Sequence, residues 1–233
     1  MVIDVIRAST TIATAVANGA AGVFPVESVE RARERASSLG ERTLLGGERG
    51  GVRIEGFDLG NSPRDYTPER VAGRQIVFTT TNGTAALAAC HEAAVAMIGC
   101  LVNRSAVAVA ARAAAGEHQA AIHLVCAGVE RQVAEEDLLG AGAILDAAAD
   151  RFPHDVFDDA AVAALKNFRD ARRKQQGTAS SEALTAALAN TPGGRRIVAL
   201  GMQADLAVVA ALDSLSTIPI LTPQKDLLLP LGS

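Results

Sequence analysis

An acid, a base and several hydroxyl side chains stand together near the start of this chain, in the pattern Asp4-x-x-Arg7 followed by Ser9 and Thr10. A carboxylate at the end of an apolar strand is costly unless it is paired or binds a metal ion. The backbone N–H groups at the start of the helix expected next would favour an anion such as phosphate. The alternative is purely structural: an Asp4–Arg7 ion pair, with Ser9 as the N-cap of the helix.

A second apolar run ends in a hydroxyl-rich turn and a glycine. Threonine hydroxyls and successive backbone N–H groups can hold a phosphate, and glycine allows the ligand to approach the backbone closely. The turn is not a P-loop, because it lacks the G-x-x-x-x-G-K-[ST] pattern. A tight turn with Thr84 as a helix cap would have the same sequence. The candidate binding residues in it are Thr79, Thr80, Thr81, Asn82, Gly83 and Thr84.

The longest candidate is segment 46–63, which contains six glycines and shows neither the helical nor the strand period. Long ordered loops in compact domains are usually functional, so we expect an active-site loop. Within it, Arg49 could bind an anion through two hydrogen bonds. Glu48 could bind a metal ion or act as a general base. Asn61 and Ser62 are further substrate-binding candidates, although Asn61 could simply hold a turn of the loop.

A third set of acids, Glu135-Glu136-Asp137, begins a long helical segment. Mg²⁺ prefers oxygen ligands and bridges one or two carboxylates to phosphate oxygens, so acids near phosphate-binding turns would suit it. An acidic first turn that only complements the helix dipole is the alternative.

Composition excludes several classes of protein. The formal net charge is −4, with no basic stripe, so nucleic acid is not an expected partner. The three cysteines form no C-x-x-C pair, which fits a reducing compartment. No apolar run approaches membrane-spanning length and no signal peptide is recognised. We therefore expect a cytoplasmic protein with no membrane partner.

Short apolar runs alternate with helical segments, which predicts an α/β fold: three layers (α/β/α) around a mostly parallel sheet. Ligands bind at the carboxyl ends of such strands, so the polar turns should share one edge of the sheet. The expected strands are 1–6, 22–26, 42–45, 75–79, 94–98, 121–126, 197–200 and 217–221, and the expected helices are 8–18, 28–38, 83–90, 105–114 and 135–149.

Residues 1–233 are expected to form a single domain. The charged helical segment 157–190 is interpreted as a helical insertion or lid, divided at Gln176-Gly177-Thr178. The late segment 217–229 could supply an edge strand, pairing locally or across the interface of a homodimer.

Three of these segments together resemble the 2-phosphosulfolactate phosphatase family: the Asp4-x-x-Arg7 run, the glycine block 47–63 and the turn 79–84. The resemblance extends to 126–128, 136–137 and 205–213. It implies an α/β/α fold and Mg²⁺-dependent hydrolysis of a phosphate monoester on a small acidic molecule, 2-phosphosulfolactate in coenzyme M biosynthesis. The chain departs from the family pattern at Val133-Ala134, where a Phe-Ser pair is usual.

This resemblance suggests roles for the candidate residues. Mg²⁺ would be bound by Asp4, Glu136 and Asp137. Glu48 or Asp4 would orient the attacking water, or Asp4 could itself be the nucleophile. Arg53 is a candidate for binding the carboxylate or sulfonate of the substrate. The phosphoryl oxygens would be held by Arg7, Arg49 and the turn 79–84.

Three alternatives stay open. The chain could be a non-catalytic protein that binds a phosphoester, a phosphatase for a different phosphorylated acid, or an unrelated isomerase or transferase of phosphorylated acids. Phosphoester binding without phosphate release would favour the first, and transfer to an acceptor other than water would support the third.

Overall fold

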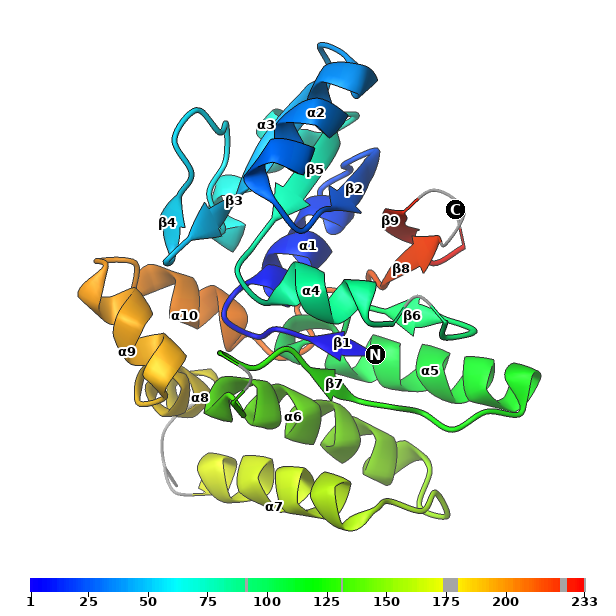
Figure 1. Cartoon of the computed structure of the whole chain (residues 1–233). Coiled ribbons are helices and arrows are strands. Elements are labelled where there is room, and N and C mark those ends of the chain that lie inside the picture. Colours follow the sequence, from blue (N-terminus) through cyan, green and yellow to red (C-terminus); the bar gives the residue numbers. More distant parts are fainter. Residues whose placement is uncertain (91, 131, 174–179, 223–225, 233) are drawn as a thin grey trace.

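The apolar runs of the sequence form the strands of two sheets, which helices cover (Figure 1). The computed structural model describes residues 1–90, 92–130, 132–173, 180–222 and 226–232. The strands are β1 (Val2–Ile3), β2 (Gly22–Pro25), β3 (Thr43–Arg49), β4 (Val52–Arg53), β5 (Gln75–Thr79), β6 (Ala96–Met97), β7 (Val125–Cys126), β8 (Pro219–Thr222) and β9 (Leu227–Pro230).

The larger sheet is mixed, and the prediction of a mostly parallel sheet is corrected here. Its seven strands follow the order β4-β3-β5-β2-β9-β8-β6. Only β3, β5 and β2 run parallel to one another. The late segment 217–229 is not an edge strand: it forms the hairpin β8–β9, which inserts between β2 and β6. Strands joined by a short hairpin must run antiparallel, so this insertion makes the sheet mixed.

The smaller sheet positions the turn after β1, which carries Asp4. In it β1 pairs in parallel with β7, and a bridge between Val2 and Ile98 connects β1 to the strand end beside β6. Asp4 therefore follows β1, whereas the threonine turn follows β5 in the other sheet. The two polar turns still meet, because a Cβ at Gly83 would lie 2.7 Å from Asp4 Oδ2.

Helices cover both faces of the parallel part of the large sheet. On one face, α2 packs with Phe24, Val77 and Leu227, and on the other α1 packs with Ile76 and Phe78. The helices are α1 (Ala8–Ala17), α2 (Val29–Leu39), α3 (Pro68–Val71), α4 (Gly83–Ala88), α5 (Arg104–His118), α6 (Glu135–Arg151), α7 (Asp159–Arg173), α8 (Ser180–Ala189), α9 (Pro192–Ala199) and α10 (Ala204–Val209), with short 3₁₀ turns at Pro63–Asp65 and Leu101–Asn103.

One expected strand is wrong. Residues 197–200 were expected to be extended, but they belong to α9 and its C-terminal cap. Thr191 accepts a hydrogen bond from the Gly194 N–H, and Pro192 stands at the first turn, so the local signals favour a helix. A run of four apolar residues cannot distinguish strand from helix by period alone.

The segment 157–190 belongs to a helical half of the molecule built around α6. Gly142 of α6 allows close packing against α7, because a Cβ there would clash with the Ala164 carbonyl. The described parts of this segment, 157–173 and 180–190, do not line the cleft described below, and a lid function for the segment stays a prediction. The expected dividing turn at 176–178 lies outside the described residues.

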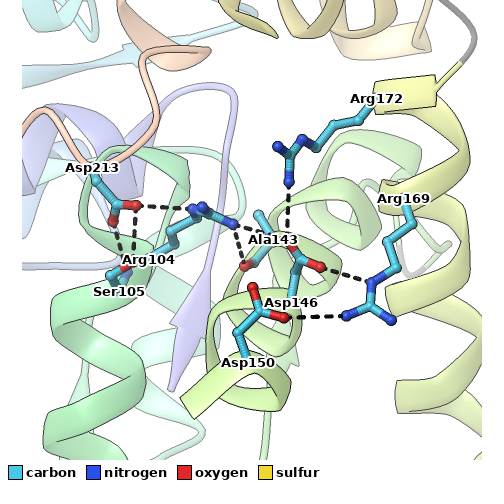
Figure 2. A network of polar contacts seen from close by, with 8 residues as sticks. All are labelled: Arg104, Ser105, Ala143, Asp146, Asp150, Arg169, Arg172 and Asp213. Atoms are coloured by element: carbon cyan, nitrogen blue, oxygen red, sulfur yellow. Dashed lines mark hydrogen bonds and ion pairs between the residues drawn. The ribbon is translucent and has the colours of Figure 1, made fainter.

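A polar network joins three helices of this half (Figure 2). Asp146 of α6 is 5% exposed and pairs with Arg104 of α5 and with Arg169 and Arg172 of α7, at 2.7–3.1 Å. The network holds α6, whose first turn carries Glu136, against its neighbours. Among the described residues, we find no helix with both the length and the apolar character needed to cross a membrane.

The glycine-rich segment is more regular than expected. Strand β3 continues to Arg49 and turns at Gly50-Gly51 into β4, with Glu48 opposite Arg53. Gly47 is required where β3 meets β5, because a Cβ there would strike the Thr79 carbonyl. The segment is therefore a β-hairpin followed by an ordered loop, and it places Glu48 beside the threonine turn.

Candidate active site

A cleft of about 430 Å³ lies where the chain leaves β1 and β5, between the tip of the β3–β4 hairpin and the first turns of α6 and α9. Buried acids and a buried arginine converge on it, so we place the candidate active site here. A larger cavity of about 680 Å³ lies beside α5 and α6, and its lining is mainly alanine and other apolar side chains. The candidate residues that line the cleft are Asp4, Arg7, Glu48, Asn61, Thr81, Asn82 and Glu136.

Asp4 is buried and held by backbone donors. Its Oδ1 accepts a hydrogen bond from the Ala8 N–H at 3.3 Å, and its own N–H donates to Ser9 Oγ at 2.9 Å. The start of α1 thus binds the Asp4 carboxylate itself. Burial, together with the nearby Glu48 and Glu136 carboxylates, raises the pKa of Asp4 to about 6, although the N–H donors of Ala8 and Gly83 act to lower it. A cation in the cleft would relieve this repulsion.

Glu48 is held between two turns. Its Oε1 accepts from the N–H and the hydroxyl of Thr81, each at 2.9 Å, and its Oε2 accepts from the Gly51 N–H at 2.5 Å. The N–H donors of the threonine turn are therefore used to fix carboxylates. This differs from the expected phosphate cradle of successive N–H groups.

Glu136 and Asp137 are neighbours with different surroundings. Asp137 does not line the cleft: its two oxygens accept the N–H groups of Val5 and Gly128, both at 2.9 Å. Burial and the charge of Asp4 raise the pKa of Asp137 to about 8. Glu136 does line the cleft, and its Oε2 is buried with no hydrogen-bond partner in the described structure.

Arg7 is buried and paired with a residue far along the chain. Its Nη1 lies 2.6 Å from Asp205 Oδ2, and both side chains are 2% exposed. Its Nη2 donates to the Gly51 carbonyl at 2.8 Å, and Ser62 donates to the other Asp205 oxygen at 2.7 Å. The Asp4–Arg7 ion pair considered from the sequence is therefore not the pair that forms, because Asp205 of α10 takes its place.

Arg49 lies outside the cleft. It joins β3 to β5 by donating to the Glu48 carbonyl at 2.7 Å and to Thr79 Oγ1 at 3.0 Å. The Thr80 hydroxyl is buried without a partner among the described residues. Thr84 donates to the Thr80 carbonyl, so it supports the turn.

Other expected residues also have supporting positions. Arg53 is exposed, donates to the Asp58 carbonyl at 3.4 Å and does not line the cleft. Thr10 donates to the Val5 carbonyl at 3.2 Å. Asn61 is in the cleft wall, and its side-chain oxygen is buried with no partner in the described part of the chain.

Two residues of this region were not predicted from the sequence to have a role. Asp205 was considered only as part of a late helix, and its pairing with Arg7 joins positions 198 residues apart. Arg196 of α9 lines the cleft, but it lies next to the expected strand 197–200 and was given no role from the sequence. The Thr-Pro-Gly-Gly helix start at 191–194 was the local signal that could have placed Arg196 on a helix.

The cleft offers oxygen ligands for a metal ion. Across the described residues, no group of three or more His, Cys, Asp or Glu side chains is arranged to hold one. Asp4 and Glu136 are two carboxylates of the same wall, and Glu136 has an unpartnered oxygen. Mg²⁺ often takes one or two protein carboxylates and completes its shell with water and phosphate, so this donor set fits Mg²⁺.

Comparisons with known proteins give a consistent assignment. A family model described as 2-phosphosulpholactate phosphatase matches residues 1–224. A probable 2-phosphosulfolactate phosphatase of Symbiobacterium thermophilum is 43% identical over 232 residues, which cover 98% of this chain and 93% of the relative. One from Thermotoga maritima is 35% identical over 221 residues, covering 95% of this chain and 88% of the relative.

A further relative, from Caldanaerobacter subterraneus subsp. tengcongensis, is 47% identical over 147 residues, which are 63% of this chain and 59% of the relative. This match spans less than two thirds of the relative's length, whereas the family model and the Symbiobacterium match extend over nearly all of this chain. The chain therefore belongs to the 2-phosphosulpholactate phosphatase family, a family of phosphoric monoester hydrolases.

Proposed function

We propose that this protein is a Mg²⁺-dependent phosphatase that hydrolyses a small phosphorylated hydroxy acid, with 2-phosphosulfolactate as the first candidate. The observation that carries the proposal is one cleft lined by the buried carboxylates Asp4 and Glu136 and the buried guanidinium of Arg7. Phosphoryl transfer depends mainly on positioning and charge neutralisation, and this arrangement offers both.

Asp4 and Glu136 would hold the metal ion. When bound, Mg²⁺ neutralises charge on the phosphoryl oxygens and lowers the pKa of a bound water. The unpartnered Glu136 oxygen and the crowding of acids around Asp4 both support a cation at this position. Asp137 is left out of the proposed ligands, because both of its oxygens already accept backbone N–H groups.

Arg7 would bind the phosphoryl group. Its ion pair with Asp205 and its hydrogen bond to the Gly51 carbonyl fix the guanidinium before substrate arrives. Preorganised charge of this kind needs no rearrangement during the reaction. Glu48, held by Thr81 and Gly51, would orient the attacking water. Asp4 as a covalent nucleophile is the competing mechanism, and a trapped phosphoenzyme would favour it.

The family departure at Val133-Ala134 supports a second candidate substrate. Both residues line the cleft, and Val133 is 72% exposed. Ala134 stands where the family usually has a serine hydroxyl, so this part of the cleft wall is less polar and would suit a different phosphorylated hydroxy acid. A role in coenzyme M biosynthesis, a cytoplasmic location and a homodimer belong to the same proposal and need their own tests.

The direct test measures phosphate release from a panel of phosphorylated hydroxy acids, including 2-phosphosulfolactate, with Mg²⁺ and with EDTA. We expect release that requires Mg²⁺. Phosphate release from another phosphorylated acid would support the proposed hydrolysis and assign the protein to a different pathway. Substrate binding without any release would replace the enzyme proposal with a phosphoester-binding protein.

Glu136→Gln, with Glu135→Gln as its matched control, tests the metal ligand. Glu135 is the exposed neighbour in the same helical turn, whereas Glu136 is 4% exposed in the cleft wall. We expect Glu136→Gln to reduce Mg²⁺ affinity or turnover by roughly 10- to 100-fold or more, and Glu135→Gln to have little effect. If the two variants had the same Mg²⁺ affinity and the same turnover, Glu136 would not be a metal ligand.

A further inference from the structure

The wall of the cleft opposite the acids is formed by α9. Pro192, Gly193, Arg196 and Ile197 line it, so the exposed guanidinium of Arg196 shares the cavity with Asp4 and Glu136. Gly193 brings this wall close, because a Cβ at that position would collide with the Glu136 carboxylate. The wall that faces the proposed metal ligands thus carries a positive charge.

Arg196 lies over the tip of the β3–β4 hairpin, where the two glycines Gly50 and Gly51 have no side chains. A Cβ at Gly50 would be 3.2 Å from Arg196 Nη2, and one at Gly51 would be 3.9 Å from its Nε. Arg7 contacts the same tip by donating to the Gly51 carbonyl. Two guanidinium groups therefore flank the hairpin tip, one buried and one exposed, and both line the cleft.

The two arginines differ in what balances their charge. Arg7 is paired with Asp205, whereas the Arg196 guanidinium makes neither a hydrogen bond nor an ion pair with any residue that the structure describes. Its neighbour Arg195 is also positively charged and lies on the same helix. Arg195, however, donates to the Asn190 carbonyl and does not line the cleft. The free charge in the cleft is specific to position 196.

We propose that Arg196 binds the second acidic group of the substrate, a carboxylate or sulfonate, while the phosphoryl group lies toward Arg7. This inference rests on the proposed function and deepens it, because it makes Arg196 a specificity-determining residue. Arg53, suggested from the sequence for this role, lies outside the cleft. An arginine fork suits both planar carboxylates and tetrahedral anions.

The test compares Arg196→Ala with Arg195→Ala on phosphoesters that differ only in their acidic groups: 2-phosphosulfolactate, 2-phospholactate and a phosphomonoester with no second acid. Charged hydrogen bonds contribute enough that we expect Arg196→Ala to lower kcat/KM for the acidic substrates roughly 10- to 150-fold, mainly through KM. Release from the phosphoester without a second acid should be unchanged, and Arg195→Ala should match the wild type throughout.

The substrate panel also identifies the group that is bound. A loss with both acidic esters indicates the carboxylate, and a loss with 2-phosphosulfolactate alone indicates the sulfonate. An equal loss on all three esters, or no loss on any, would overturn the proposal. Arg196→Lys should recover part of the affinity, because it restores charge without the planar fork.

A binding measurement separates this inference from the proposed activity. Calorimetric titration with sulfolactate, which has no phosphate to release, needs no turnover. If the wild type binds sulfolactate and Arg196→Ala does not, the acidic subsite stands even when every phosphoester in the panel is left intact. If the wild type and Arg196→Ala bind sulfolactate equally well, the proposed subsite is contradicted, even when the protein proves to be a phosphatase.

Discussion

Backbone N–H groups hold three of the buried acids in and beside the cleft. Ala8 donates to Asp4, Gly51 and Thr81 donate to Glu48, and Val5 and Gly128 donate to Asp137. Glu136 keeps an oxygen without such a donor. At the residue scale, this difference separates Asp137, whose two oxygens both accept N–H groups, from Glu136, the acid best able to accept a new ligand.

The Arg7–Asp205 pair gives a prediction at the same scale. Removing one partner of a buried ion pair leaves a buried charge unpaired. We expect Asp205→Ala to lower the free energy of unfolding by about 3–5 kcal/mol, measured by urea denaturation. Phosphate release should fall as well, because the guanidinium of Arg7 loses its anchor.

Ser62→Ala is the matched control for that variant. It removes only the hydrogen bond to the second Asp205 oxygen, so a loss of about 1 kcal/mol is expected. If Asp205→Ala were as stable as Ser62→Ala, the buried pair would not have the stabilising role assigned to it.

Single residues show where sequence reasoning reached its limit. Asp4, Glu48 and Glu136 could be singled out, because Asp4 follows an apolar run, Glu48 lies in the glycine-rich segment and Glu136 is at a predicted helix start. Their distinction from Asp137 could not, because it depends on which oxygens meet N–H groups from distant segments. Successive helix positions point in different directions, so adjacent acids have different neighbours.

At the scale of elements, Asp146 connects α6 to α5 and to α7 through ion pairs of its buried carboxylate (Figure 2). Asp146→Ala should lower the free energy of unfolding by about 3 kcal/mol, because it removes the buried partner shared by three arginine side chains. Urea denaturation measures the change.

Asp150→Ala provides the control within the same helix and the same network. Asp150 is 73% exposed and meets Arg169 at 3.7 Å, so its loss should cost less than about 1 kcal/mol. Similar losses in the two variants would mean that burial of Asp146 does not determine the strength of its pairs.

The elements themselves were the most predictable part of the fold. The helical period and the Ser28 N-cap were sufficient to place α2, and the run Gln75–Thr79 was recognised as a strand with its observed bounds. The order of strands was not predictable, because β9 pairs with β2 across some two hundred residues. Nothing in a local apolar run specifies so distant a partner.

At the scale of the whole molecule, the hairpin β8–β9 joins the parallel strands to the remainder of the large sheet. Leu228 of β9 lies opposite Val23 of β2 and is fully buried. Leu228→Ala should destabilise the protein by about 2–5 kcal/mol through lost contacts and a cavity. Thermal or urea unfolding measures this loss.

Leu231→Ala is the comparison for that variant, because Leu231 lies just beyond the strand and is 51% exposed. Its effect should stay within about 0.5 kcal/mol. A small effect at both positions would mean that the hairpin is not an integral part of the core.

The central position of β9 also bears on how the protein is made. Ribosomes deliver a chain in order, so β2 emerges long before the strand that will cover its edge. During that interval β2 presents unpaired backbone groups, which can pair with another nascent chain. Aggregation during synthesis is therefore a particular hazard for this topology, and chaperones that shield exposed strand edges should improve the yield of folded enzyme.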